Sequence, residues 1–534
     1  MKTTGLGKLS RAQRITLSLV VFMLAGASIN VVAQQGAETT PAGTLTSNSE
    51  LVLVPVQVKR AGKPLRGLTQ NDFVLRSDGK MQPIEVFEES SGQPVGGDAI
   101  VKPATPSAGV QEFSNLPVGG MPEHLLIIAV DWVNSPYAEQ AWAQQGLLKY
   151  FAKDQPKQPF ALVAFTEDGL VQIHPSSSDP AALQAAIREA HSQLGKAERR
   201  AMTARELLEK QTGLTLKSEA ADRESVEAKA IDATMLSFVQ LEKVYGGVPG
   251  RKSLVWLADR MPDLPAIAAI LNRGNIALYP VSVGGALADP HYLADLTAPA
   301  TPGSFGTGDI SSSPEQSNAM RDLASRTGGR FCPATTALNS CIEQAVADST
   351  DYYLLGFYVS QQDRKPGWHN LQVKLASQKA EVYARSGYYL EPRTVPTENE
   401  IRNDLIAAAN TKLDYNGVVF SVERLADSTV LPAATLSFRI HVPSSSVLLP
   451  SGRRSLSYEI AMIVLSEKGE PTATAKTVHL DLNAEQTDSA LTHGWRYDET
   501  LPKPGLATAV RFIIRDNGSG NIGSVVVPAV VVPR

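Results

Sequence analysis

Four apolar runs in the middle of the chain give the clearest secondary-structure signal. Polar residues do not alternate with apolar ones within them, which predicts strands covered on both faces, as in a parallel sheet. The runs are Leu125–Val130, Phe160–Phe165, Leu254–Ala258 and Ile276–Val283. Apolar residues also recur at steps of three and four from Ala228 to Tyr245, which predicts a helix with one apolar face. This alternation predicts an α/β doubly wound sheet of Rossmann type over residues 122–350, with helices on both faces.

Shorter strand-like segments flank this region on both sides. Leu51–Lys59 alternates around Pro55 and predicts an edge strand, because proline cannot donate a hydrogen bond within a central strand. Further short strands are expected at Phe73–Leu75, Ile84–Phe87, Tyr352–Val359, Leu371–Leu375 and Val382–Ala384. The β units at 50–90 and 351–391 each have too few strands to be stable alone. We therefore hypothesise that these two units pair with each other.

The last part of the chain, residues 401–534, has a repeated strand pattern. About seven strand-like segments follow at regular spacing, separated by Gly, Pro, Asn and Ser. This spacing predicts a C-terminal β-sandwich of immunoglobulin-like type. Two stretches with many turn-forming residues, 91–121 and 392–400, are expected to be linkers.

The N-terminus has the pattern of a secretory signal peptide. Four basic residues within the first fourteen positions precede an apolar stretch, Ile15–Ala27, and Val31–Ala33 offers a cleavage site of small residues. We expect residues 1–33 to be removed and the polar segment 34–49 to be a disordered leader. The alternative is an uncleaved membrane anchor, since Ile15–Ala33 nearly has the length of a bilayer span.

Charge and cysteine content fit an exported protein, periplasmic or secreted. The net charge is −4, and removing the four positive charges of residues 1–33 moves it to −8. A mildly acidic protein has no electrostatic footprint for nucleic acid or anionic lipid, and no second segment has the length of a membrane span. The only cysteines, Cys332 and Cys341, are nine positions apart and predict a small disulfide loop. Two free buried thiols are the alternative.

Polar residues stand where the first predicted parallel strand ends. Asp131 follows Leu125–Val130 directly, and Ser135 precedes Pro136 at the expected start of a helix. In open α/β sheets, ligands bind in the crevice at the carboxyl ends of the strands. Asp131 and Ser135 are therefore candidate site residues. The alternative is that they only cap the first helix.

These residues resemble the metal-ion-dependent adhesion site of von Willebrand factor A (VWA) domains, which begins with Asp-x-Ser-x-Ser. Asp131 and Ser135 match the first and last members, Val133 replaces the first serine, and Asn134 offers a substitute oxygen. Asp259, directly after the third apolar run, matches a second aspartate of these domains. The resemblance implies a degenerate, all-oxygen site for Mg²⁺ or Ca²⁺ made by Asp131, Asn134, Ser135 and Asp259.

The chain is more specifically similar to the VWFA-related proteins first grouped from acidobacteria. This similarity spans roughly Leu51 to Tyr389 and includes Gly67–Phe73, Gly250–Lys252 and Arg385–Tyr389. It implies an adhesion-type protein that recognises another protein.

Sequence signatures of catalysis are missing. The chain has no His-Glu-x-x-His, no Gly-x-Ser-x-Gly and no lysine-bearing phosphate loop, and its eight histidines are scattered. We therefore expect an exported, non-enzymatic interaction protein that binds a protein partner through the crevice or the sandwich surfaces. The alternative is an extracytoplasmic hydrolase or carbohydrate-active enzyme with an accessory β-sandwich, which would need a paired-carboxylate or nucleophile–base cleft.

Overall fold

The computed structural model describes most of the chain, and the described residues belong to two compact units. The described residues are 50–90, 112–115, 124–135, 137–153, 159–190, 220–248, 250–259, 265–283, 314–333, 338–360, 363–376, 379–392, 396–425, 435–447, 454–467, 471–502 and 507–529. The N-terminal unit contains those within 50–90 and 124–392, and the C-terminal unit those within 112–115 and 396–529. The predicted signal peptide at 1–33 and leader at 34–49 lie outside the described residues.

A five-stranded mixed sheet forms part of the N-terminal unit. Its strands are β7 (Leu125–Asp131), β8 (Phe160–Thr166), β9 (Gly169–Ser177), β10 (Lys252–Ala258) and β11 (Ile276–Ser282). They lie in the order β11-β10-β7-β8-β9, and all pairs are parallel except the last, where β9 runs antiparallel to β8. Because β7 and β10 are parallel neighbours, their carboxyl ends meet at the same edge of the sheet.

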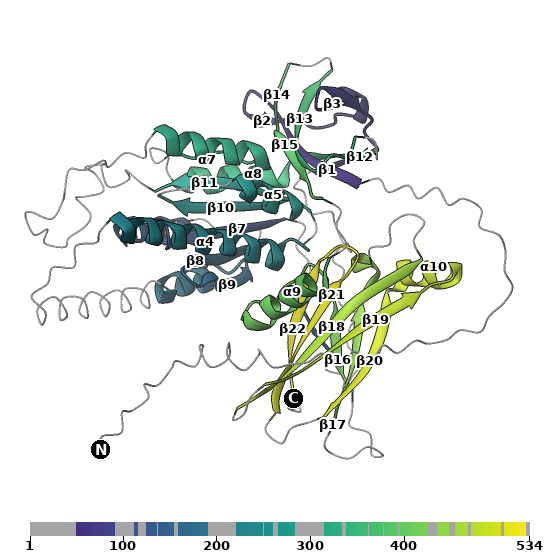
Figure 1. The fold of residues 1–534 in the computed structure, drawn as a ribbon. Coiled ribbons are helices and arrows are strands. Elements are labelled where there is room, and N and C mark those ends of the chain that lie inside the picture. The colour runs from purple at the N-terminus through teal and green to yellow at the C-terminus, as the bar shows by residue number, and fades with distance from the viewer. Residues whose placement is uncertain are drawn as a thin grey trace, which may run out of the picture. The chain divides into compact units, whose positions relative to one another are not determined.

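Helices cover both faces of this mixed sheet (Figure 1). One face packs against α2 (Tyr137–Lys153) and α8 (Leu338–Thr350), and the other against α4 (Ala220–Tyr245), α5 (Pro265–Arg273) and α7 (Pro314–Thr327). On the second face, the ring of Phe238 from α4 lies 4.9 Å from Phe165 and 5.2 Å from Trp256, between ring centroids. Burial on both faces explains why these strands are apolar without alternation.

Two antiparallel sheets complete the N-terminal unit. Their strands are β1 (Glu50–Arg60), β2 (Lys63–Pro64), β3 (Phe73–Ser77), β4 (Lys80–Gln82), β5 (Val86–Ser90), β12 (Tyr352–Val359), β13 (Gly367–Leu375), β14 (Glu381–Ala384) and β15 (Gly387–Leu390), with a 3₁₀ turn, η1 (Gln70–Asp72), before β3. One sheet has the order β14-β1-β12-β5, with β2 beside β1, and the other has the order β15-β13-β3-β4.

These two sheets bring together segments that are far apart in the sequence. Val54 of β1 lies opposite Leu355 of β12, and Leu75 of β3 lies opposite Val373 of β13. Figure 1 shows β1 beside β12. The strands of 50–90 therefore pair with those of 352–390, as the shortage of strands in each segment suggested, and they share one apolar core.

The C-terminal unit contains two antiparallel sheets over one core. The first has the order β20 (Trp495–Pro502), β17 (Thr435–Val442), β16 (Ser421–Arg424) and β6 (Glu112–Ser114), and the second the order β19 (Thr472–Asp481), β18 (Ser455–Ser466), β21 (Ala507–Asp516) and β22 (Ile522–Pro528). Two helices, α9 (Glu398–Asn410) and α10 (Ala484–His493), and a 3₁₀ turn, η3 (Ser444–Ser446), accompany them. Phe438 and Phe512 meet across the core at 4.9 Å between ring centroids. This arrangement agrees with the β-sandwich part of the prediction.

The predicted fold class, an α/β doubly wound protein of Rossmann type, is wrong. Four of the five sheets among the described residues contain only antiparallel pairs, and even the mixed sheet has an antiparallel edge strand. The molecule is mostly antiparallel β structure. The prediction gave too much weight to the unbroken apolar runs, whereas the short alternating strands hold most of the sheet structure. The linker prediction also fails at Glu112–Ser114, which form β6 and pair with β16.

No helix within the described ranges is both long and apolar enough to cross a membrane.

Candidate functional site

Asp131 ends β7 and organises the connection that follows it. Its side chain is fully buried. One carboxylate oxygen, Oδ1, accepts the backbone N–H groups of Val133 at 2.9 Å and Asn134 at 2.8 Å. The other, Oδ2, accepts the Asn134 side-chain amide at 2.8 Å. This is the local turn that aspartate side chains favour, in which the carboxylate satisfies backbone donors two and three residues ahead.

Asn134 links this turn to helix α4. Its Nδ2 also donates to Oγ1 of Thr234 at 2.8 Å, and the Thr234 hydroxyl donates to the carbonyl of Ala230 at 2.7 Å. A carboxylate can only accept at this distance, so the amide nitrogen of Asn134, rather than its oxygen, faces Asp131. The expectation that Asn134 offers an oxygen at this place therefore does not hold.

The side chain of Ser135 contacts the backbone of Asp259. The N–H of Asp259, directly after β10, donates to Oγ of Ser135 at 3.1 Å. The structure thus brings all four predicted site residues to one edge of the mixed sheet. The bonds of Asp131 and Ser135 go to the connection itself and to the neighbouring strand end.

Burial changes the acid–base behaviour of this site. It raises the pKa of Asp131 to about 6, and the hydrogen bonds from Asn134 and Val133 lower that pKa by less than burial raises it. Among the described residues, the donors around this carboxyl group are neutral, and no cation offsets the cost of burying its charge. Its protonation therefore changes between weakly acidic and neutral pH.

The residues at this edge do not fit a Mg²⁺ or Ca²⁺ ion as they are arranged. Both oxygens of Asp131 accept N–H groups, and the amide of Asn134 presents hydrogens where a cation would need an oxygen. Ser135 Oγ already accepts a backbone N–H. Across the described part of the chain, no three His, Cys, Asp or Glu side chains gather as a metal-binding group.

Sequence reasoning missed Thr234. It lies in α4 with an exposed fraction of 0% and contacts Asn134, one hundred positions away in the chain. A signal for it is present in the sequence, because Thr234 falls on the apolar face of the predicted helix, between Ile231 and Phe238. A polar residue on an apolar helix face requires a buried hydrogen-bond partner, and here Asn134 supplies it.

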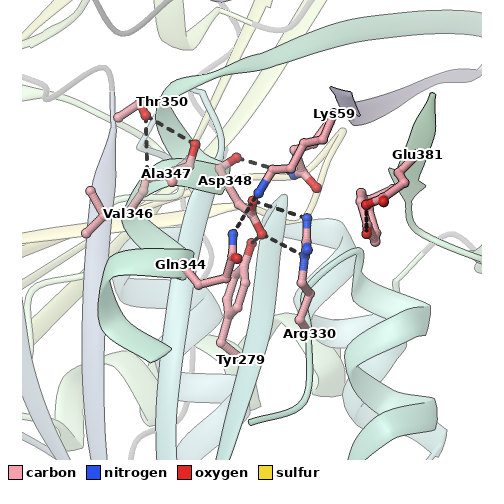
Figure 2. A network of polar contacts seen from close by, with 12 residues as sticks. Lys59, Tyr279, Arg330, Gln344, Val346, Ala347, Asp348, Thr350 and Glu381 are labelled. Carbon is pink, nitrogen blue, oxygen red and sulfur yellow. Dashed lines mark hydrogen bonds and ion pairs between the residues drawn. The ribbon is translucent and has the colours of Figure 1, made fainter. Parts of the chain in front are cut away.

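A second buried carboxylate, Asp348 of α8, lies at the junction of a β sheet and the mixed sheet. Figure 2 shows the side chains that converge on it. Lys59 Nζ of β1 lies 3.0 Å from Oδ1, and Arg330 Nε lies 3.0 Å from Oδ2. The hydroxyl of Tyr279 from β11 donates to Oδ2 at 3.2 Å, and Gln344 Nε2 donates to Oδ1 at 2.8 Å.

This Asp348 network ties three elements of the N-terminal unit into one frame. Sequence reasoning missed it, although Asp348 continues the buried face of α8 formed by Leu338, Cys341, Ile342 and Ala345. A carboxylate in that position is normally paired. Arg330 also stacks on the ring of Tyr383, 3.7 Å from its centroid, which fixes the guanidinium from its other side.

The predicted disulfide between Cys332 and Cys341 is present, with their Cα atoms 6.1 Å apart. Cys332 lies beside β11, where its N–H donates to the carbonyl of Pro280 at 2.9 Å and its carbonyl accepts the N–H of Ser282 at 3.0 Å. Cys341 is buried in α8. The bond therefore joins the helix that carries Asp348 to the edge of the mixed sheet.

A patch of exposed apolar side chains lies where α4 packs against β9. Leu236 and Val239 of α4 have exposed fractions of 43% and 37%, and we call these two residues the α4–β9 patch. Leu236 lies beside Gly169 at the start of β9. Leu236 is two positions from Thr234 on the same helix, so the two side chains point to nearly opposite sides of it.

Comparisons with protein-family models and with curated proteins find no match for the chain. The resemblance to VWA domains therefore stays a prediction from the residues quoted above.

Proposed function

We propose that this is an exported, non-enzymatic protein that binds another protein at the α4–β9 patch. The observation that carries the proposal is the exposure of two apolar side chains one turn apart on α4, where this helix packs against the edge strand β9. Exposed apolar area is unfavourable in water by about 25 cal/mol per Å², so a cluster of such residues marks an interaction surface.

The edge position of β9 adds to the support. Within the described residues, β8 is the only strand that pairs with β9. A long edge strand offers backbone N–H and C=O groups to an extended segment of a partner, and exposed apolar side chains beside it give specificity. The partner we propose is a protein that adds an extended apolar segment to this edge.

The Asp131 connection would hold in place the helix that carries the patch. Asn134 joins the connection to Thr234, one half-turn from Leu236 on α4. The N-terminal sequence pattern and the disulfide support export, because disulfides persist in oxidising compartments.

Site-specific photo-crosslinking in cells that export the full chain tests the proposal. A photoreactive amino acid at Leu236 or Val239 is expected to give a protein adduct of defined mass. The same amino acid at Lys229, exposed on the same helix, is the matched control. Adducts at Leu236 that equal those at Lys229 in identity and yield, or no adduct at either patch position, would contradict the proposal.

A further inference from the structure

A second candidate binding site, separate from the α4–β9 patch, is a cleft of about 340 Å³ in the N-terminal unit. It lies between α5 and strands β1 and β15. Its walls include Leu51, Arg273, Arg385, Tyr389 and Glu391. Its size is within the lower range of small-molecule sites.

Arg385 is the unusual residue of this cleft. It stands between β14 and β15 and is only 9% exposed. Its Nη2 donates to the carbonyl of Leu53 at 2.7 Å, whereas its Nε is buried without a hydrogen-bond partner among the described residues. No described carboxylate forms an ion pair with it. A buried guanidinium in this state keeps an unused donor and an unneutralised charge, both of which are costly.

The neighbouring charges do not relieve this cost. Burial, opposed in part by Tyr388 and aided by the positive charge of Arg251, lowers the pKa of Arg385 to about 10. The group is therefore still charged at neutral pH. Glu391, the one carboxylate among the described residues of the cleft wall, lies 3.0 Å from Arg273 and is paired there. Among these described residues, Arg385 is thus left as a positive charge without a counterion.

The cleft wall also includes two polar side chains, Asn272 and Asn275, and two large, partly exposed apolar ones. Leu51 of β1 and Tyr389 of β15 have exposed fractions of 40% and 41%, although both are large side chains. An aromatic or aliphatic group between them would bury that area. Arginine suits a carboxylate because its planar guanidinium can donate two parallel hydrogen bonds to the two oxygens.

We propose that this cleft binds a small monocarboxylate whose apolar body lies against Leu51 and Tyr389 and whose carboxylate pairs with Arg385. A single uncompensated cation fits a singly charged ligand. A dianion such as phosphate would bring a second negative charge close to Glu391. This inference does not depend on the proposed protein-binding function.

Ligand-observed saturation-transfer NMR and calorimetry on the full mature chain test the proposal. The probe is 3-phenylpropionate, and its neutral amide, 3-phenylpropionamide, is the matched control ligand. Octanoate, acetate and inorganic phosphate complete the series. The expected result is saturable binding of 3-phenylpropionate and octanoate, with the amide at least about tenfold weaker, the usual effect of losing a charge-assisted hydrogen bond.

Three variants locate the site. Arg385→Gln is expected to weaken 3-phenylpropionate binding at least about tenfold. Tyr389→Ala removes an exposed wall residue, is expected to leave the fold intact and should weaken binding several-fold, so the test stands even if Arg385→Gln unfolds. Arg439→Gln changes an exposed arginine paired with Asp498 in the C-terminal unit and should bind as the unchanged protein does.

The proposal is overturned by any of four results. The first is that neither 3-phenylpropionate nor octanoate binds at millimolar concentration. The second and third are that the amide, or phosphate, binds as tightly as 3-phenylpropionate. The fourth is that a folded Arg385→Gln or Tyr389→Ala protein binds 3-phenylpropionate with unchanged affinity.

Discussion

Asp131 and Asp348 are both completely buried carboxylates, but their surroundings differ. Asp348 faces two cations, Lys59 and Arg330. Asp131 meets only neutral N–H groups, two of them from its own turn, and burial raises its pKa to about 6. Asp348 is an ion-paired carboxylate in a structural junction. Asp131 is a group whose charge changes near physiological pH.

This difference follows from where each carboxylate lies. Asp348 sits between a β sheet and the mixed sheet, where side chains from β1, β11 and α8 reach it from several directions (Figure 2). Asp131 sits at the carboxyl end of a strand, the edge at which ligands bind in sheets with parallel strands. At the junction, the buried charge of Asp348 is neutralised by cations. At the end of β7, the carboxylate of Asp131 instead satisfies the backbone N–H groups of its own turn.

The largest expected effect is at Asp348. Asp348→Asn removes the charge that neutralises Lys59 and Arg330 and leaves two cations facing one another. We expect the free energy of unfolding, measured by urea denaturation, to fall by about 3–5 kcal/mol. Asp351→Asn, which breaks the partly exposed ion pair with Arg66 just beyond the same helix, is the matched control and should cost less than about 1 kcal/mol. Equal losses in the two variants would remove the distinction between a buried junction and a surface pair.

A smaller effect on the free energy of unfolding is expected at Asp131, and this effect should depend on pH. Its pKa in the folded protein lies above that of an unfolded aspartate, so the folded state binds the proton more tightly, and protonation stabilises it. The stability of the unchanged protein relative to Asp131→Asn should therefore rise as pH falls from 7 to 5. We expect a gain of about 1 kcal/mol, because one unit of pKa shift corresponds to about 1.4 kcal/mol.

The measurement is a series of urea denaturation curves for both proteins between pH 7 and pH 5. The difference between the two proteins isolates Asp131, since the other carboxylates are common to both. A difference that stays constant with pH, or that shrinks on acidification, would show that burial does not raise this pKa.

The smallest effect tests whether Asn134 and Thr234 couple the turn to α4. Thr234→Val keeps the shape of the side chain but removes the acceptor for the Asn134 amide. We expect a loss of about 1 kcal/mol in the free energy of unfolding, the net value of one buried hydrogen bond. Ser237→Ala, one turn later on α4, removes a hydroxyl that bonds to the helix's own carbonyl at Ala233, and should change stability less. Equal effects would argue against the coupling.

Part of the fold was predictable because it is local. The strands β7, β8, β10 and β11 were predicted within one or two residues, since a run buried on both faces has an apolar residue at every position. The Cys332–Cys341 bond was predictable from the spacing of the cysteines together with the expectation of export. The four candidate residues at the carboxyl edge were also placed together, because parallel neighbouring strands end at one edge.

The fold class was not predictable in this way. The segments with the strongest apolar pattern do not make up most of the sheet structure. The short strands of 50–90 and 352–390 contribute much of it, but each has only a weak sequence pattern. They are stable because they pair with segments about 300 residues away, as Val54 does with Leu355. The same holds for β6, three residues inside an apparent linker that form a strand only because β16 lies beside them.

By itself, the sequence determined which segments are buried, where the first parallel strand hands over to its helix, and which two cysteines can bond. Only the tertiary structure decided that most strands pair antiparallel, that Asn134 turns its nitrogen to Asp131, and that Lys59 reaches Asp348 across 289 positions. The physical reason is the distance along the chain over which each interaction acts. Burial leaves its pattern in adjacent residues, whereas strand direction, the orientation of an amide and the pairing of a buried charge depend on partners that no local pattern specifies.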